Sequence, residues 1–196
     1  MKLVVGLGNP GPDYRGTRHN VGYEVLEHLA RHEGLLFRSP RDLEDNHGLR
    51  DFRWARSFEP DVLLVLPETF MNLSGTVVAP LARSRQIPAE RVLVVYDDLD
   101  LPVGRVRIRP HGGTGGQKGM RSIVEHLGTD AFPRIRVGIG RPRTDAARHV
   151  LSPFTPDERT DVDIAVAEAA EAILDWCLTG DIEKCMTRFH SRWSQG

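Results

Sequence analysis

The sequence is poor in cysteine and has no long hydrophobic run. Its 196 residues include only two cysteines, Cys177 and Cys185, which lack C-x-x-C spacing, so we expect neither a disulfide framework nor a zinc knuckle. No apolar stretch approaches the roughly 18 residues that a membrane-spanning helix needs. The first residues, MKLVVGLGNPG, resemble a first strand more than a signal peptide. These absences predict a cytoplasmic protein without a membrane partner.

Several motifs that would identify an enzyme class are incomplete or missing. In GGTGGQKG (112–119) the lysine is not followed by Ser or Thr, as a phosphate-binding NTPase loop requires. His28 and His32 have i,i+4 spacing, but the residues between them lack the glutamate of an H-E-x-x-H zinc site. No serine lies in a G-x-S-x-G elbow, and Cys177 falls in an alanine-rich helix that favours packing over reactivity. Nucleotide, zinc and serine mechanisms are therefore disfavoured.

Short apolar runs alternate with stretches of helical periodicity. The strand-like runs are rich in Val, Ile and Leu and cover 2–6, 61–67, 91–98 and 134–140, with alternating patterns near 50–56 and over 105–109. Helical spacing occupies 21–29, stretches starting near 74 and 116, 156–178, and a last segment ending near 193. This order predicts one α/β domain over residues 1–196, with a twisted, mostly parallel mixed sheet, helices on both faces and a helical C-terminus.

Turn and cap residues set the expected boundaries. Pro80 lies in the helical stretch that starts near Ser74, so we expect this helix to begin late or to kink. Thr155 is placed to cap the long helix that follows it. Residues 38–50 are polar and aperiodic, which predicts a loop.

The first strand is followed by GLGNPG, in which Gly6, Gly8 and Gly11 match the spacing G-x-G-x-x-G. A dinucleotide site needs a helix to begin at the third glycine, because the pyrophosphate rests on its free N–H groups. Here Pro10 lies inside the motif and the helical pattern begins only near Asn20. A tight turn that leaves a strand is favoured, and no cofactor is expected.

Polar residues follow three of the predicted strands. Asn9 and His19 come after the first strand, Asn72 after the second and Asp97 after the third. Because the carboxyl ends of parallel strands meet at one crevice, we expect these side chains to converge. An imidazole that takes a proton from water, a carboxylate that fixes its tautomer and amides that orient substrate are suited to hydrolysis.

The acidic end of the strand over 91–98 has a second interpretation. Asp97, Asp98 and Asp100 are all carboxylates, the ligands that magnesium prefers. Adjacent residues of a strand point to opposite faces, however, so Asp97 and Asp98 should not face one ion. Hydrogen-bonding roles are favoured, and no metal is predicted.

Charge is segregated along the chain although its net value is only −1. Residues 102–150 hold ten Lys or Arg against three Asp or Glu. Charge alone does not distinguish a surface for a polyanion from a solvated basic face. Arg105, Arg107 and Arg109 share one face of their strand, and Lys118 and Arg121 lie at a glycine-rich helix start, where N–H groups favour phosphate.

Five motifs in order resemble those of bacterial-type peptidyl-tRNA hydrolases. They are GLGNPGPDYRGTRHNVG (6–22), PETFMNLSG (67–75), YDDLDLPVGRVRIR (96–109), GGTGGQKGM (112–120) and RIRVGIGRP (134–142). The resemblance implies metal-free cleavage of the ester between a peptide and the terminal ribose of tRNA, which recycles tRNA from stalled translation. The implied partner is peptidyl-tRNA, held at its acceptor end and CCA terminus. We expect a monomer with no obligate protein partner.

The same resemblance implies roles for individual residues. His19 becomes the general base and Asp97 its partner, while Asn9 and Asn72 hold substrate and water. Positions implied to line the crevice are Tyr14, Asn20 and Met71, and those implied to contact tRNA phosphates are Arg105, Arg107, Arg109, Lys118, Arg121 and Arg134. Phosphate contacts position a nucleic acid without reading its sequence, which suits an enzyme that accepts many tRNAs.

One position departs from the family pattern. Gln117 and Lys118 stand where the family most often has His-Asn. An asparagine both donates and accepts hydrogen bonds, whereas an ammonium group only donates, so Lys118 is expected to bind phosphate and not to hold water. A non-catalytic RNA-binding member of the same fold family is the alternative interpretation, which the presence of His19 and Asp97 disfavours.

Overall fold

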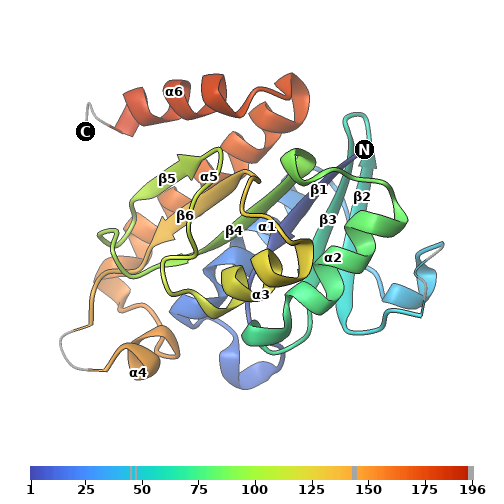
Figure 1. Ribbon diagram of the computed structural model, residues 1–196. Coiled ribbons are helices and arrows are strands. Elements are labelled where there is room, and N and C mark those ends of the chain that lie inside the picture. The colour runs from blue at the N-terminus through green and yellow to red at the C-terminus, as the bar shows by residue number, and fades with distance from the viewer. Residues whose placement is uncertain (45, 47, 143–144, 194–196) are drawn as a thin grey trace.

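The protein is built on one six-stranded sheet. The computed structural model describes residues 1–44, 46, 48–142 and 145–193. The strands are β1 (Lys2–Gly6), β2 (Phe52–Phe58), β3 (Asp61–Pro67), β4 (Val92–Asp98), β5 (Val106–Arg109) and β6 (Arg134–Gly138), in the spatial order β2-β3-β1-β4-β6-β5 (Figure 1). The four central strands are parallel, and the edge strands β2 and β5 are antiparallel to their neighbours. The predicted mostly parallel, mixed sheet is confirmed.

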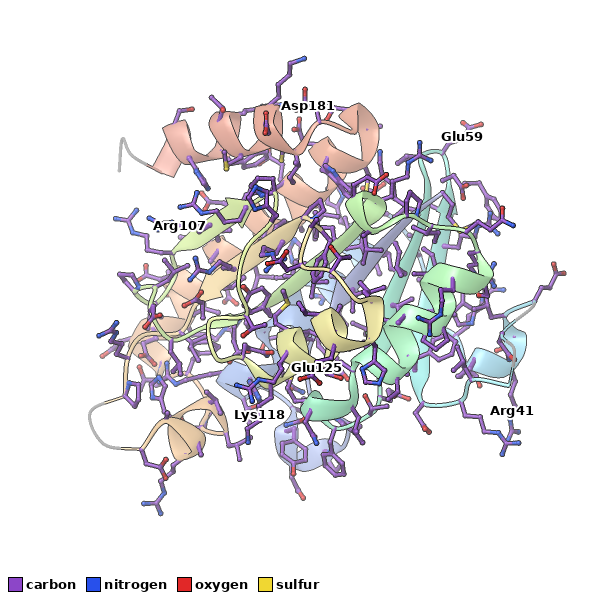
Figure 2. All side chains as sticks on the ribbon, viewed as in Figure 1. Arg41, Glu59, Arg107, Lys118, Glu125 and Asp181 are labelled. Atoms are coloured by element: carbon purple, nitrogen blue, oxygen red, sulfur yellow. The ribbon has the colours of Figure 1, made fainter. Side chains whose placement is uncertain are left out.

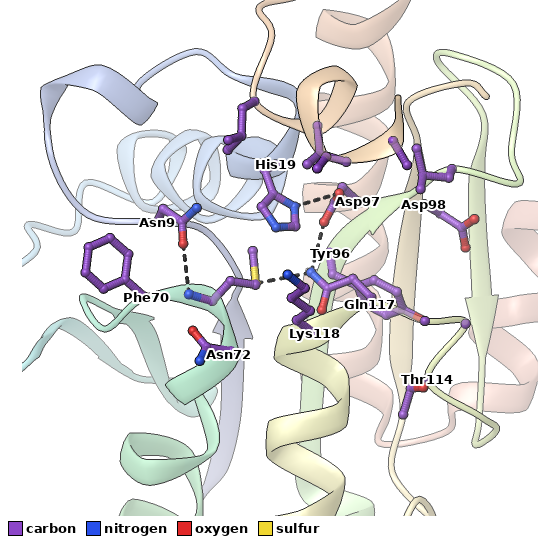
Figure 3. Close-up of a pocket in the computed structure, with 18 residues that line it drawn as sticks. Asn9, His19, Phe70, Asn72, Tyr96, Asp97, Asp98, Thr114, Gln117 and Lys118 are labelled. Carbon is purple, nitrogen blue, oxygen red and sulfur yellow. Dashed lines mark hydrogen bonds and ion pairs between the residues drawn. The ribbon is translucent and has the colours of Figure 1, made fainter. Parts of the chain in front are cut away.

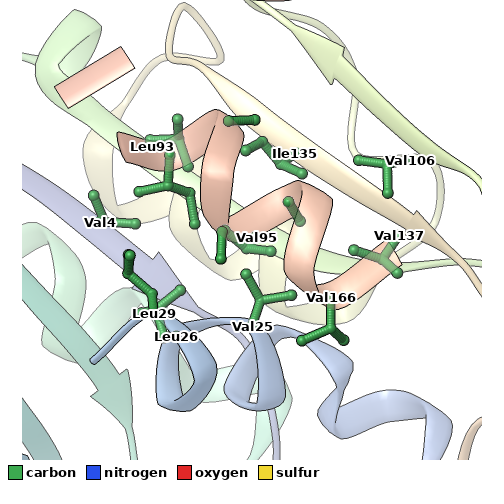
Figure 4. Close-up of a cluster of buried hydrophobic side chains, with 14 of the residues drawn as sticks. Val4, Val25, Leu26, Leu29, Leu93, Val95, Val106, Ile135, Val137 and Val166 are labelled. Atoms are coloured by element: carbon green, nitrogen blue, oxygen red, sulfur yellow. The ribbon is translucent and has the colours of Figure 1, made fainter. Parts of the chain in front are cut away.

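Helices cover both faces of this sheet, as the sequence predicts. They are α1 (Val21–His32), α2 (Gly75–Ser84), α3 (Lys118–Leu127), α4 (Ala146–Val150), α5 (Pro156–Thr179) and α6 (Ile182–Trp193). Helices α1 and α5 pack on one face, where Val4 and Val95 meet Leu26 and Val166 (Figure 4). Helices α2 and α3 pack on the other face. Because both faces are covered, the central strands are rich in apolar residues, and every residue of β4 is buried.

Local signals explain most helix boundaries. Thr155 caps α5 in a reciprocal capping box: its hydroxyl accepts the Glu158 N–H, and the Glu158 carboxylate accepts the Thr155 N–H. Of the two effects expected of Pro80, the late start is wrong, because α2 begins at Gly75 and includes the proline, whereas the kink stays a prediction. The Gly75 N–H donates to the Ser122 hydroxyl at 3.0 Å, so contact with α3 anchors the first turn ahead of the proline.

The polar stretch 38–50 is mostly irregular, with one turn of 3₁₀ helix, η3 (Pro40–Asp42). Residues 45 and 47 of this stretch lie outside the described residues. At the opposite edge of the sheet, α6 packs against β5, and the His190 Nε2 atom accepts the Ile108 N–H at 3.0 Å. This contact occupies a backbone donor of the edge strand that would otherwise invite pairing with another chain. Within the part of the chain that the structure describes, no helix combines the length and apolarity that crossing a bilayer requires.

Candidate active site

A pocket of about 540 Å³ opens at the carboxyl ends of β1 and β4 (Figure 3). Its lining comes from the loop after β1, the segment after β3, the end of β4, the start of α3 and helix α4. Among the predicted site residues, Asn9, His19, Met71, Asn72, Asp97 and Lys118 line it. The convergence expected from the parallel sheet is therefore present.

The central interaction joins His19 to Asp97. His19 lies in the 3₁₀ helix η2 (Arg18–Asn20), directly before α1, and Asp97 lies near the end of β4. The Nδ1 atom of His19 is 2.8 Å from Oδ2 of Asp97, whose side chain is only 2% exposed. Since an ionised carboxylate only accepts hydrogen bonds, Nδ1 carries the proton and Nε2 is the basic nitrogen. The ring thus has the tautomer that a general base needs.

Asn9 is held from two sides. Its backbone N–H donates to Oδ1 of Asn20 at 2.9 Å, and Nδ2 of Asn20 donates to the Asn9 carbonyl at 3.0 Å. The Asn9 side-chain Oδ1 accepts the Met71 N–H at 2.8 Å. With Oδ1 engaged, Asn9 offers its Nδ2 amino group to the pocket (Figure 3).

Two residues predicted to line the crevice have other positions. Asn20 is 5% exposed, and both polar atoms of its side chain are used by the Asn9 backbone. In this structure the Asn20 side chain supports Asn9, and its predicted contact with substrate stays a prediction. Tyr14 lies beside the pocket, where its ring contacts Phe70 edge to face with 6.3 Å between centroids. Phe70 itself lines the pocket.

The glycines of GLGNPG allow this part of the chain to pack closely. A Cβ atom at Gly8 would lie 2.7 Å from the Tyr23 ring, so only glycine lets α1 approach the end of β1. Gly11 has φ +102°, a backbone conformation that L side chains rarely adopt. The motif thus forms the tight turn expected from the sequence, and α1 begins only at Val21.

The loop that carries His19 is tied to α5 by a partly buried ion pair. Arg18 is 5% exposed, and its guanidinium group donates to both carboxylate oxygens of Glu158, at 3.1 and 2.7 Å. Burial acts to raise the pKa of Glu158, but the hydrogen bonds from Arg18 and Thr155 outweigh it and hold that pKa below its ordinary value. An Arg–carboxylate fork is rigid, so it fixes the position of the neighbouring His19.

Helix α4, which the sequence does not predict, forms an apolar wall of the pocket through Ala146, Ala147 and Val150. His149 Nε2 donates to the carbonyls of Ile139 and Gly140, both at 3.0 Å, and thereby ties α4 to the end of β6. Residues 143–144, just before this helix, lie outside the described residues.

The aspartates that suggested a metal site have separate partners. Asp98 forms an ion pair with Arg136 on the opposite face of the sheet from the His19–Asp97 pair, as the alternation of strand side chains predicts. The Asp98 carboxylate also accepts the Asp100 N–H at 2.8 Å, and Asp100 pairs with Arg141 at the surface. Among the described residues, no group of three or more His, Cys, Asp or Glu side chains is arranged to hold a metal ion.

Basic residues gather on the face of β5 and β6 beyond α3. Arg105 and Arg107 are exposed, and Arg136 is the cross-strand partner of Arg107. Burial, followed by the nearby charges of Arg107 and Arg136, lowers the pKa of Arg109 below its ordinary value. Figure 2 shows Arg107 projecting from β5 and Lys118 from the start of α3. These cations lie close enough to repel one another, and a cluster of like charges of this kind is typical of an anion-binding surface.

Arg134 does not belong to this surface. It is 1% exposed, and its guanidinium donates to the backbone carbonyls of Gly113, Asp130 and Phe132 at 3.1, 2.6 and 3.2 Å. Burial lowers its pKa below the ordinary value. In this structure Arg134 holds the loop before α3, and its predicted phosphate contact stays a prediction. Lys118 and Arg121 are exposed on α3.

Two residues to which the sequence analysis gives no role belong to the pocket or to the basic face beside it. Arg136 belongs to the basic block, but only the strand register places it beside Arg107. Gln117 donates from Nε2 to Oδ1 of Asp97 at 3.0 Å. The signal in the sequence is its position directly before a helix, which identifies it as an N-cap but not as a partner of Asp97.

Fold and site together define an α/β protein whose His–carboxylate pair and amide groups are arranged to activate water for hydrolysis. The model of the peptidyl-tRNA hydrolase family matches residues 3–195. The chain belongs to the peptidyl-tRNA hydrolase family.

Individual relatives agree with this assignment. The peptidyl-tRNA hydrolase of Syntrophomonas wolfei is 49% identical over 181 residues, which cover 92% of this chain and 95% of that protein. The peptidyl-tRNA hydrolase of Caldanaerobacter subterraneus is 44% identical, over 97% of this chain and 100% of that protein. A crystal structure of peptidyl-tRNA hydrolase from Acinetobacter baumannii superposes with a TM-score of 0.86 at 34% identity and covers 96% of this chain and 94% of that chain.

Proposed function

We propose that this protein hydrolyses the ester bond between peptide and tRNA in peptidyl-tRNA and so returns free tRNA from stalled translation. The observation that carries the proposal is the His19–Asp97 pair, set in a pocket beside the Asn9 amide. Membership of the family supports the same substrate. The proposal places the enzyme in the cytoplasm as a monomer.

The geometry supports a base-catalysed attack by water. His19 Nε2 takes a proton from a water molecule, whose oxygen attacks the ester carbonyl carbon. Asp97 stabilises the imidazolium that forms, because it accepts the Nδ1 proton at 2.8 Å. The amides of Asn9 and Asn72 donate to the substrate and to the developing oxyanion. Collapse of the tetrahedral intermediate expels the ribose oxygen, which takes the proton back from His19.

The tRNA would bind across α3 and β5. Lys118 lines the pocket and is proposed to bind a phosphate near the CCA terminus. Arg105, Arg107 and Arg109, with Arg121 on α3, are proposed to contact phosphates of the acceptor end. In this proposal Arg136 takes the place of Arg134, because Arg136 lies beside Arg107, whereas Arg134 is buried beneath the loop before α3.

Release of peptide from peptidyl-tRNA in EDTA tests this function. We expect hydrolysis by the wild-type protein and a loss of about 10²- to 10⁴-fold in His19→Ala, the usual contribution of a general base. His32→Ala is the matched control, because His32 is exposed and pairs only with its neighbour Glu33 among the described contacts. Binding of tRNA to His19→Ala should stay near that of wild type.

Each contrary outcome has a distinct meaning. Binding without release by the wild-type protein would identify a non-catalytic RNA-binding protein. Release only with added metal would contradict the metal-free mechanism. Full activity in His19→Ala would remove His19 from the role of base.

A further inference from the structure

The side chain of Gln117 makes three hydrogen bonds that connect separate parts of the site. It is the N-cap residue of α3, and its Oε1 atom accepts the Met120 N–H at 2.8 Å. Its Nε2 atom donates to Oδ1 of Asp97 at 3.0 Å and to Sδ of Met71 at 3.1 Å (Figure 3). The side chain thus links the first turn of α3 to the end of β4.

The orientation of this amide is determined by its partners. The free N–H groups of the first helical turn can only donate, so the atom that caps Met120 must be the oxygen. The amino group is then the end that faces Asp97. A carboxylate accepts and an amino group donates, so both ends of the Gln117 amide are matched to their partners.

Gln117 and His19 each form a hydrogen bond to a different carboxylate oxygen of Asp97. His19 Nδ1 bonds to Oδ2 and Gln117 Nε2 bonds to Oδ1. A carboxylate bonded at only one oxygen can rotate about its Cβ–Cγ bond, whereas one bonded at both oxygens has a fixed plane. Because Asp97 is 3% exposed, water has little access to replace the amide donor. The plane of Asp97 in turn directs the imidazole of His19.

We infer that Gln117 is a positioning residue: its amide fixes the Asp97 carboxylate from the start of α3 and so aligns His19 for proton transfer. The inference rests on the proposed hydrolase function. Gln117 does not react with substrate and acts through Asp97. Since an amide does not titrate, the donor that Gln117 offers to Asp97 does not depend on pH. Lys118, the next residue, binds substrate in the proposed function, so the same helical turn serves both alignment and substrate binding.

Two substitutions separate this role from helix capping. Gln117→Ser keeps a side chain favoured at the N-cap, but the hydroxyl is too short to reach Asp97. We expect the thermal midpoint to change little, while kcat falls about 10- to 100-fold with KM nearly unchanged. Gln117→Glu keeps a capping oxygen but places a second anion beside Asp97. We expect a lower kcat and an acidic limb of the kcat/KM profile that moves up by roughly one pH unit, because the anion favours protonated imidazole.

Two further measurements complete the test. Gln117→His has a ring N–H that can donate to Asp97, and we expect kcat within about threefold of wild type. In an Asp97→Asn background, Gln117→Ser should cause no further loss, because residues that act as a unit are not additive.

Unchanged kcat in Gln117→Ser would overturn the inference and leave Gln117 as a helix cap alone. A further loss in the Asp97→Asn background would also overturn it, since the effect would then bypass Asp97. These results are distinguishable from failure of the proposed function, in which the wild-type protein would release no peptide.

Discussion

The basic face of β5 leads to a quantitative prediction for tRNA binding. We consider Arg107→Gln combined with Arg109→Gln. Arg107 is exposed, and burial, followed by the neighbouring charges of Arg107 and Arg136, lowers the pKa of Arg109. Removing both charges relieves this mutual repulsion, so the variant should fold at least as well as wild type. A loss of binding would therefore report on lost phosphate contacts and not on unfolding.

The size of the effect follows from counterion release. Each lost phosphate contact flattens the slope of log K against log salt by about 0.9, so two contacts remove about 1.8. The counterion-release contribution to affinity vanishes at about 1 M salt. At roughly 0.15 M salt, the loss of the two contacts should therefore weaken tRNA binding about 30-fold. At higher salt the curves of variant and wild type should converge.

Fluorescence anisotropy with labelled tRNA over a salt series measures both quantities, in a His19→Ala background to prevent turnover. Arg134→Gln is the matched control, because it removes a nearby arginine whose guanidinium is buried against carbonyls. It should leave the slope unchanged but cost about 1–3 kcal/mol of stability, since buried carbonyls lose their donors. An unchanged slope in the double variant would place the tRNA elsewhere. A flatter slope in Arg134→Gln would contradict the assignment of Arg134 to the interior.

Two further variants test supporting contacts. Asn20→Ala leaves the Asn9 backbone without its side-chain partners, and we expect kcat/KM for peptidyl-tRNA to fall about tenfold or more; unchanged kinetics would show that Asn9 is held by Met71 alone. Burial, followed by the charges of Arg109 and Arg107, lowers the pKa of His190 from its ordinary value of about 6.5. The neutral imidazole therefore stabilises the folded protein above about pH 6.5, and this stabilisation is lost as the pH falls through the lowered pKa. Scanning calorimetry should show a thermal midpoint that falls between about pH 7.5 and 5.5 more steeply in wild type than in His190→Gln, and parallel curves would refute this.

The sheet and the central residues of the site can be predicted from the sequence because they follow simple periodicities. The apolar runs mark the strands, and the rule that parallel strands end at one edge brings Asn9, His19 and Asp97 together. The tight turn at GLGNPG is likewise predictable, since Pro10 and the distant helix start exclude a cofactor helix.

The remaining features depend on contacts between distant segments. Arg134 and Arg136 share one face of β6, but the carbonyls of Gly113, Asp130 and Phe132 surround the first and not the second. Asn20 lies within a motif that suggests substrate contact, yet its amide is used by Asn9. Helix α2 begins ahead of Pro80 at Gly75, whose N–H bonds to Ser122 of another helix. Such outcomes are decided by tertiary packing, which local patterns do not encode.

The contact between the first strand and helix α5 has a consequence for folding on the ribosome. The Lys2 ammonium group donates to the carbonyls of Trp176 and Cys177, the first of which is 174 residues away along the chain. The apolar cluster on this face also joins Val4 to Phe189. Contacts so distant in sequence cannot form until nearly the whole chain has left the exit tunnel, so α1 can cover its part of this face early, whereas α5 is added only at the end. A protein proposed to act on unfinished chains thus completes its own core only when its synthesis is almost finished.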